Sequence, residues 1–190
     1  MAMPALPSEW TVDMVRALPE DGNRYEVIDG ELFVTPSPSY AHQRAVRELA
    51  LLIEPYVRGI GIGEVIFSPA DVVVFGPKKF VQPDLFVVPT VNDAPAKSWV
   101  EVGRLLLAVE VVSPSTARTD RGKKRELYQD KAVPEYWVVD VEERMVQRWR
   151  PDDSLPEVLS ETLDWQPDGE APPLVIELPV LFDRAQGLIR

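Results

Sequence analysis

The chain has 190 residues, 45% of them hydrophobic, which is enough to bury the core of one sizeable domain without disulfides or a structural metal. It contains no cysteine, which excludes thiol catalysis, thiolate-bound zinc and a disulfide framework. The formal net charge of −11 at pH 7 opposes non-specific binding to nucleic acid.

The distribution of charge along the chain is uneven. Residues 151–190 hold nine acids and two bases, whereas the segment from Glu110 to Lys131 holds four acids and six bases and is the only locally basic stretch. No apolar stretch approaches the ~20 residues of a membrane span, and the N-terminal residues lack the basic and apolar regions of a signal peptide. We therefore expect a cytoplasmic protein with no membrane segment.

The N-terminal part of the chain predicts a short helix and a hairpin. Ser8 can cap a helix over residues 9–17, where apolar residues recur at helical spacing. The Asp29-Gly30 pair lies between two strand-like segments of residues 24–35. This pair is a strong signal for a two-residue type I′ turn, so we expect a β-hairpin there.

A long helix and several strands are expected next. Ser39 can cap a helix from about Tyr40 to Val57, and Pro55 predicts a kink or an earlier end. An antiparallel meander of short β segments follows at residues 64–67, 71–75 and 80–88.

The second half of the chain predicts a β-α-β unit. Residues 104–112 are apolar on both faces, as in a central strand, and a helix over about 119–131 leads to a strand at 135–141. Such lengths predict a parallel crossover, and residues 144–149 form a hairpin with the second strand. Further short β segments are expected at 157–160 and 174–178.

We therefore expect a single α/β (α+β) domain over residues 1–190. Its core would span about residues 20–150 and consist of a mixed β-sheet flanked by helices, with the hairpin at its N-terminal side. The acidic, proline-rich residues 151–190 would form a C-terminal β extension packed on the same domain.

Two acids stand within apolar segments in the middle of the chain. Asp84 follows Pro83 and precedes the apolar run 86–88. Glu110 lies inside the apolar run from Leu105 to Val112. Burial of an isolated carboxylate is strongly unfavourable, so both side chains should be partnered, protonated or bound to a metal.

A lysine on the following helix is the expected partner of these acids. At about 100° per residue, Lys124 falls between Leu127 and Tyr128 on the apolar face of the helix, whereas Lys123 points away. A lysine that faces the sheet requires a carboxylate, and Asp84 and Glu110 are available.

Two strand carboxylates and a lysine suit metal-assisted hydrolysis of a phosphodiester. Asp84 and Glu110 would hold Mg²⁺ or Mn²⁺, with the backbone carbonyl of Val111 and water completing the coordination. The cation would acidify water and neutralise charge in the transition state. Lys124 would orient the attacking water or stabilise the developing negative charge.

The spacing of these residues resembles a known signature. Pro83-Asp84 followed by Glu110-Val111-Val112 is similar to the PD-(D/E)XK pattern of restriction-endonuclease-like nucleases. A longer pattern resembles the Uma-type restriction endonuclease family, long known as a domain of unknown function. It comprises residues 25–36, 42–44, 109–116 and 120–124, Tyr128, and residues 133–137.

This resemblance covers about residues 10–150 and implies a restriction-endonuclease-like fold with a site at one end of the sheet. One position departs from the superfamily pattern, because Val112 stands where the lysine is expected. The resemblance implies that the lysine has moved to the next helix, at Lys124. The helical periodicity indicates the same residue independently.

Several other residues are candidates with a competing structural role. Glu31 could add a carboxylate or be a solvent-facing hairpin residue, and His42, the only histidine, could contact phosphate or be a helix-start residue. A basic patch that could contact nucleic acid, or be a solvated helix face, comprises Arg118, Arg121 and Lys123. Residues 113–116 are expected to form a loop and helix cap rather than a nucleophile elbow.

The hypothesis is a Mg²⁺-dependent DNA endonuclease, acting as a homodimer or with a partner protein because the chain is so acidic. The alternative is a catalytically silent nuclease-fold protein that binds protein or nucleic acid. In that case Asp84 is a turn residue and Glu110–Lys124 a structural salt bridge.

Overall fold

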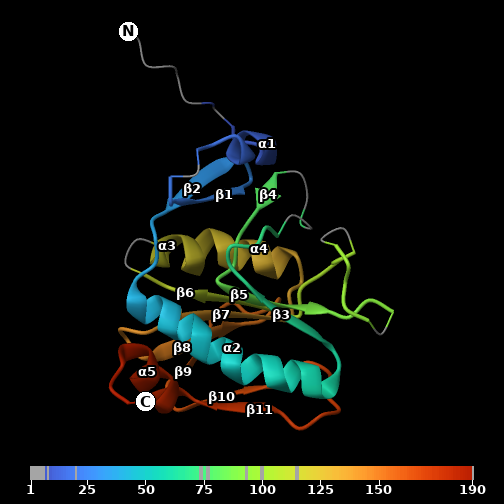
Figure 1. The fold of residues 1–190 in the computed structure, drawn as a ribbon, viewed down its shortest axis with the longest axis vertical. Coiled ribbons are helices and arrows are strands. Elements are labelled where there is room, and N and C mark those ends of the chain that lie inside the picture. The colour runs from blue at the N-terminus through green and yellow to red at the C-terminus, as the bar shows by residue number, and fades with distance from the viewer. Residues whose placement is uncertain are drawn as a thin grey trace.

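The computed structural model describes residue 7 and residues 9–19, 21–72, 75, 78–92, 94–98, 101–113 and 116–189 (Figure 1). The helices are α1 (Val12–Arg16), α2 (Tyr40–Ile60), α3 (Ala117–Thr119), the π-helical turn η1 (Asp120–Lys124), α4 (Arg125–Asp130) and α5 (Leu178–Gln186). The strands are β1 (Arg24–Ile28), β2 (Glu31–Thr35), β3 (Gly63–Phe67), β4 (Lys79–Phe80), β5 (Leu85–Pro89), β6 (Leu107–Val111), β7 (Glu135–Asp140), β8 (Met145–Trp149), β9 (Glu157–Leu159), β10 (Thr162–Trp165) and β11 (Leu174–Glu177).

A six-stranded mixed sheet in the order β3-β5-β6-β7-β8-β9 forms the centre of the molecule. Strands β6 and β7 run parallel and are joined by the helical segment α3-η1-α4, which confirms the predicted crossover. The other neighbouring strands of this sheet are antiparallel, including the predicted β7-β8 hairpin. The expected mixed sheet flanked by helices is confirmed.

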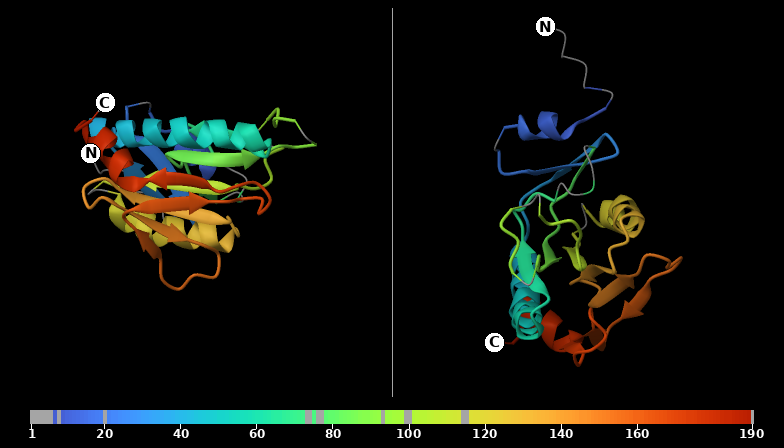
Figure 2. Two further views of the ribbon diagram at one scale, coloured as in Figure 1. Left: turned by 90° about the horizontal axis from the view of Figure 1, so that it is seen from below. Right: turned by 90° about the vertical axis from the view of Figure 1, so that its right-hand side faces the viewer.

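The two faces of this sheet are covered by different elements (Figure 2). Helices α2 and α5, with strands β10 and β11, cover one face, and α4 covers the other. Because side chains alternate along a strand, β6 sends Leu107, Val109 and Val111 to the α2 face and Ala108 to the α4 face. Glu110 therefore faces α4, and it is fully buried.

A second sheet, in the order β2-β1-β4, lies with α1 beyond the α4 side of the central sheet (Figure 1). Its β1-β2 hairpin turns at Asp29 and Gly30, whose φ angles are 50° and 82°. Positive φ at both central residues is the requirement of a type I′ turn, so the predicted hairpin is confirmed.

Helix α1 is shorter than predicted, because it begins at Val12 rather than near residue 9. The Thr11 side chain accepts a hydrogen bond from the Met14 amide and is the N-cap. The proposed cap Ser8 lies outside the described residues.

Helix α2 begins as predicted, with the Ser39 hydroxyl accepting a hydrogen bond from the His42 amide at 3.2 Å. It does not end near Pro55 but continues to Ile60, where Gly61 adopts a left-handed conformation. Proline leaves the carbonyl four residues earlier without its helical partner. That residue is Leu51, which is 62% exposed, so its carbonyl lies on the side of the helix open to solvent.

The prediction of a single strand over residues 80–88 is wrong, because these residues contribute to two strands in two different sheets. Phe80 belongs to β4, which pairs with β1, whereas Leu85 begins β5, which pairs with β3 and β6. Pro83 lacks an amide hydrogen and cannot continue a ladder, so the chain crosses between the sheets there. In the predicted strand 71–75, Val72 forms an isolated bridge with Val81, and residues 73 and 74 lie outside the described part.

The helix predicted over 119–131 is not uniformly α-helical. It begins at Ala117, passes through the π-helical turn η1 and ends at Asp130. The constant angle of about 100° per residue that was used to predict the inward-facing side chains is therefore an approximation for this segment. Lys124 nevertheless points inward with Leu127 and Tyr128, and Lys123 is exposed.

The C-terminal residues pack on the α2 side of the core. Strands β9 and β11 occupy the predicted segments, but β10 and the helix α5 were not predicted. Helix α5 starts with Pro179 in its first turn and ends at Gly187 with a left-handed conformation, and both are helix-boundary signals that the sequence contains. None of the helices in the described part of the chain has the length and apolar character that a membrane span requires.

Candidate active site

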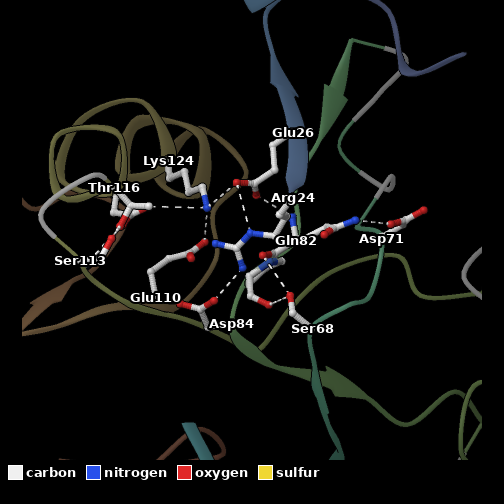
Figure 3. Close-up of polar contacts among 12 residues, drawn as sticks. Arg24, Glu26, Ser68, Asp71, Gln82, Asp84, Glu110, Ser113, Thr116 and Lys124 are labelled. Atoms are coloured by element: carbon white, nitrogen blue, oxygen red, sulfur yellow. Dashed lines mark hydrogen bonds and ion pairs between the residues drawn. The ribbon is translucent and has the colours of Figure 1, made fainter. Parts of the chain in front are cut away.

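Four buried carboxylates and two buried or half-buried cations meet where the two sheets approach each other. Figure 3 shows Glu26, Asp84 and Glu110 of this group with both cations. We call this group the acid cluster: Arg24 and Glu26 from β1, Asp84 from the segment before β5, Glu110 from β6, and Asp120 and Lys124 from η1. The structure thus brings together the predicted Asp84, Glu110 and Lys124.

Lys124 is the centre of the acid cluster. Its Nζ lies 2.9 Å from Glu26 Oε2, 2.9 Å from Glu110 Oε1 and 3.5 Å from Asp120 Oδ1. Burial acts to lower the pKa of this ammonium, but the Glu110, Glu26 and Asp120 carboxylates raise it above its usual value. Lys124 is therefore a fixed positive charge and not a proton acceptor at neutral pH.

Two residues of the π-helical turn η1 reach the cluster. Asp120 and Lys124 open and close η1, and both side chains are buried. The Tyr136 hydroxyl donates a hydrogen bond to the Asp120 carbonyl oxygen at 3.0 Å and ties the turn to β7. Single π turns inside α-helices are rare and occur often at functional sites.

Asp84 is held from three directions. Its Oδ1 accepts a 2.7 Å hydrogen bond from Arg24 Nη1, and its Oδ2 accepts one of 2.8 Å from the Val111 amide. His42 Nε2 lies 3.0 Å from the same Oδ2. Burial acts to raise the pKa of Asp84, but the His42 hydrogen bond and the Arg24 charge hold it well below its usual value. Asp84 is therefore ionised.

Glu110 is satisfied on one oxygen only. Its Oε1 accepts hydrogen bonds from Lys124 at 2.9 Å and from the Tyr128 hydroxyl at 3.3 Å. Its Oε2 is buried and accepts no hydrogen bond from any described residue. Burial raises the pKa of Glu110 well above its usual value, since the charge of Lys124 only partly offsets it and Asp84 adds to the rise.

Glu26 is a site residue that the sequence reasoning missed. Its Oε2 contacts Lys124, and its Oε1 accepts a 2.7 Å hydrogen bond from the Gln82 amide. Glu26 thereby joins β1, the helix and the segment that carries Asp84. The signal was available, because Glu26 lies in the predicted strand Tyr25-Glu26-Val27-Ile28, beside apolar residues as Glu110 does.

Arg24 was also missed, and here the sequence offers no local signal. It is the first residue of β1 and contacts Asp84, 60 residues away along the chain. Burial acts to lower the pKa of Arg24, but Asp84, Glu110 and Glu26 raise it. Only the packing of the hairpin against the central sheet brings these groups together.

A pocket of about 790 Å³ opens beside the cluster. Arg24, His42 and Asp84 line it, whereas Glu110 and Lys124 are not among its lining residues and lie behind them. Its other walls come mainly from the segment around Pro36 and from α1 with its following loop. A ligand in this pocket therefore meets Arg24, His42 and Asp84 first.

The other candidate residues fall into two groups. His42 and the Val111 backbone reach the site, although it is the Val111 amide, rather than its carbonyl, that contacts Asp84. Glu31 does not reach it: it pairs with Ile28 at the end of the hairpin, and its half-exposed carboxylate lies 3.6 Å from Lys123 Nζ.

The predicted basic patch is partly neutralised within the molecule. Arg121 donates to Asp140 at 2.6 Å and to Gln147 at 3.0 Å, and Lys123 pairs with Glu31. Arg118 is exposed. Thr116, after the loop, accepts a hydrogen bond from the Ser113 amide at 3.1 Å, whereas Pro114 and Ser115 lie outside the described residues.

The acid cluster fits a divalent cation in charge and in donor type. Four carboxyl groups face two cations, Lys124 and Arg24, and one histidine, so the acids outnumber the cations, and Glu110 Oε2 has a free lone pair. The described residues contain no group of three or more histidine, aspartate or glutamate side chains placed to hold a metal ion. Asp84 and Glu110 alone could supply two carboxylates, which is the usual number for Mg²⁺ with water filling the rest.

Comparison with solved structures defines the class of fold. The chain is similar to the crystal structure of a putative nuclease of the family DUF820 from Anabaena variabilis, with a TM-score of 0.70 and 18% sequence identity over 93% of this chain and 99% of that chain. The fold is therefore that of a nuclease-like α+β protein.

The family follows from the sequence itself. The profile of the family Uma2, described as "Putative restriction endonuclease", matches residues 12–163. The chain belongs to the Uma2 family, as its motifs predicted. No curated protein matches the chain.

Proposed function

We propose that this protein is a divalent-cation-dependent endonuclease that hydrolyses phosphodiester bonds of DNA. The observation that carries the proposal is the buried oxygen Glu110 Oε2, which accepts no hydrogen bond from the described residues and lies in a cluster where acids outnumber cations. An unpartnered buried carboxylate oxygen is costly unless a ligand satisfies it. The Uma2 family membership supports the same reaction class.

The residues of the cluster would divide the work. Asp84 and Glu110 would hold Mg²⁺ or Mn²⁺, which supplies Lewis acidity towards phosphate oxygen and water when bound. Lys124, fixed between Glu26 and Glu110, would stabilise negative charge that develops on the phosphate. Arg24 and His42, at the pocket wall, would contact the substrate phosphate.

The test is cleavage of supercoiled plasmid DNA by the purified protein with Mg²⁺, with Mn²⁺, and with a chelator. We expect nicking that requires the cation and is reduced at least ~100-fold in Asp84→Asn and Glu110→Gln. The matched control is Glu31→Gln, a hairpin acid outside the cluster, which should cleave like the wild type. Absence of cleavage by the folded wild type with either cation contradicts the proposal.

A second candidate is a catalytically silent nuclease fold that binds protein or nucleic acid. The observation in its favour is that both oxygens of Asp84 are already engaged, by Arg24, His42 and the Val111 amide. Calorimetric titration with Mg²⁺ separates the two candidates. Equal heats for the wild type and Glu110→Gln would leave the cluster a structural ion network.

The acidic surface bears on how DNA would be bound. With a net charge of −11, one copy lacks a broad basic surface, so we infer that substrate binding uses a second copy or a partner protein. Sedimentation of the protein with and without duplex DNA tests this, and a monomer that binds DNA tightly alone would contradict it.

A further inference from the structure

The two cations of the acid cluster have different surroundings. The Lys124 side chain is only 2% exposed, and its ammonium lies within 3.5 Å of three carboxylates. Its movement out of the cluster would leave these three buried carboxylates without a positive partner. The Arg24 side chain is 17% exposed and lines the pocket. Its one short contact to an acid is that to Asp84, since Glu26 lies 3.9 Å away.

Arg24 occupies the lone pairs that a cation would need. Asp84 Oδ2 accepts from the Val111 amide and lies beside His42, which leaves Oδ1 as the oxygen open to exchange. Arg24 Nη1 donates to Oδ1 at 2.7 Å. A cation bound by Asp84 and Glu110 would therefore compete with the guanidinium for the same carboxylate.

The Arg24 guanidinium could also contact a ligand in the pocket. Its Nε is buried and donates no hydrogen bond to a described residue, so part of its donor capacity is unused. The pocket beside it is large enough for a nucleotide-sized group and opens onto Arg24. A guanidinium presents a planar fork of donors that matches the oxygens of a phosphate.

We propose that Arg24 is an exchangeable cation: it neutralises Asp84 in the cation-free protein and turns into the pocket to bind a backbone phosphate of the nucleic acid when a divalent cation takes Asp84. This inference rests on the proposed function. Asp84 then always has one positive partner, and the phosphate-binding group is released only when the site is loaded.

The proposal predicts effects of opposite sign when Arg24 is removed. In Arg24→Gln, Mn²⁺ should bind about tenfold more tightly than in the wild type, because its competitor is gone. A short DNA duplex, measured with Ca²⁺ in place of Mg²⁺, should bind about tenfold more weakly, because the phosphate loses its fork of donors. A residue with a merely structural role would weaken both.

The matched control is Arg16→Gln. Arg16 lines the same pocket, but its guanidinium lies over the Phe80 ring rather than beside an acid of the cluster. Its Mn²⁺ affinity should equal that of the wild type. Thermal unfolding of each variant checks that it is folded.

Arg24→Lys keeps the positive charge and provides a second test of the proposal if Arg24→Gln does not fold. A lysine is a point charge without the fork, so this variant should bind the DNA duplex about tenfold more weakly than the wild type. Wild-type DNA affinity in Arg24→Lys overturns the inference.

The binding measurements distinguish a failure of the inference from a failure of the proposed function. If the wild type binds Mn²⁺ but Arg24→Gln binds it no more tightly, Arg24 does not compete with the cation and the inference is wrong, while the proposed function stands. If the folded wild type binds no Mn²⁺, the proposed function itself is wrong, and the inference with it.

Discussion

Both faces of the central sheet carry an apolar cluster, but the two faces differ in the charged groups that they bury. On the α2 face, aliphatic and aromatic side chains fill the space. The one buried acid of α2, Glu48, pairs with the exposed Arg47 and the partly exposed Arg184. On the α4 face, Glu110 points from the same strand that supplies Val109 and Val111 to the apolar core. Because side chains alternate along a strand, β6 contributes to the apolar core on one face and to the charged cluster on the other.

The two kinds of burial differ in how much they stabilise the fold. Burial of apolar side chains stabilises the fold by roughly 25 cal/mol per Å² of area removed from water. A buried ion network offers little net stabilisation, because desolvation offsets the attraction of the charges. Four buried carboxylates around Lys124 and Arg24 therefore add little to stability, which is consistent with the function proposed above.

Replacement of Lys124 by methionine should have the largest effect, because it leaves Glu26, Glu110 and Asp120 without their shared cation. We expect a loss of about 3–5 kcal/mol in the free energy of unfolding and no detectable cleavage. Urea denaturation measures the free energy of unfolding. The exposed neighbour Lys123→Met is the control and should resemble the wild type. Wild-type stability of Lys124→Met would show that the cluster is not a coupled charge network.

On the α2 face, Leu49→Ala should reduce stability by about 2–5 kcal/mol, because Leu49 is fully buried and its removal leaves a cavity. Cleavage per folded molecule should not change, since Leu49 lies on the opposite side of the sheet from the cluster. Leu51→Ala on the exposed side of the same helix is the control. A specific loss of cleavage in Leu49→Ala at a temperature where it is folded would contradict the division between the faces.

Tyr136→Phe removes the hydrogen bond from the hydroxyl to the carbonyl of Asp120. We expect a loss of about 1.5 kcal/mol in the free energy of unfolding, and weaker cleavage because the π turn that aims Lys124 is less restrained. Tyr40→Phe, on a ring that is 74% exposed, is the control. Unchanged cleavage together with reduced stability would assign this bond to folding alone.

The smallest effect is expected for Ser39→Ala, which removes the N-cap of α2. The loss should be about 1 kcal/mol, measured by urea denaturation. Because the capped amide is that of His42, cleavage reports whether the start of α2 also positions this side chain against Asp84. Ser154→Ala on the exposed surface is the control. A stability equal to that of the wild type would mean that the cap contributes nothing.

Much of the site was predictable because charged residues in apolar strands restrict their own surroundings. Asp84 and Glu110 had to find partners once buried, and the periodicity of the following helix indicated Lys124. The same criterion applied to β1 indicates Glu26. The π turn was not predictable, since a wheel of constant angle contains no information about a local change in helix type.

The sequence by itself determined the local features: the type I′ turn at Asp29-Gly30, the Ser39 cap and the alternation that buries Glu110. These depend on the φ preferences and side-chain periodicity of neighbouring residues. The tertiary structure alone decided that Arg24 meets Asp84 and that Glu26 meets Gln82, across 60 and 56 residues of chain. Such contacts depend on how the hairpin packs against the central sheet, and no short stretch of sequence encodes that packing.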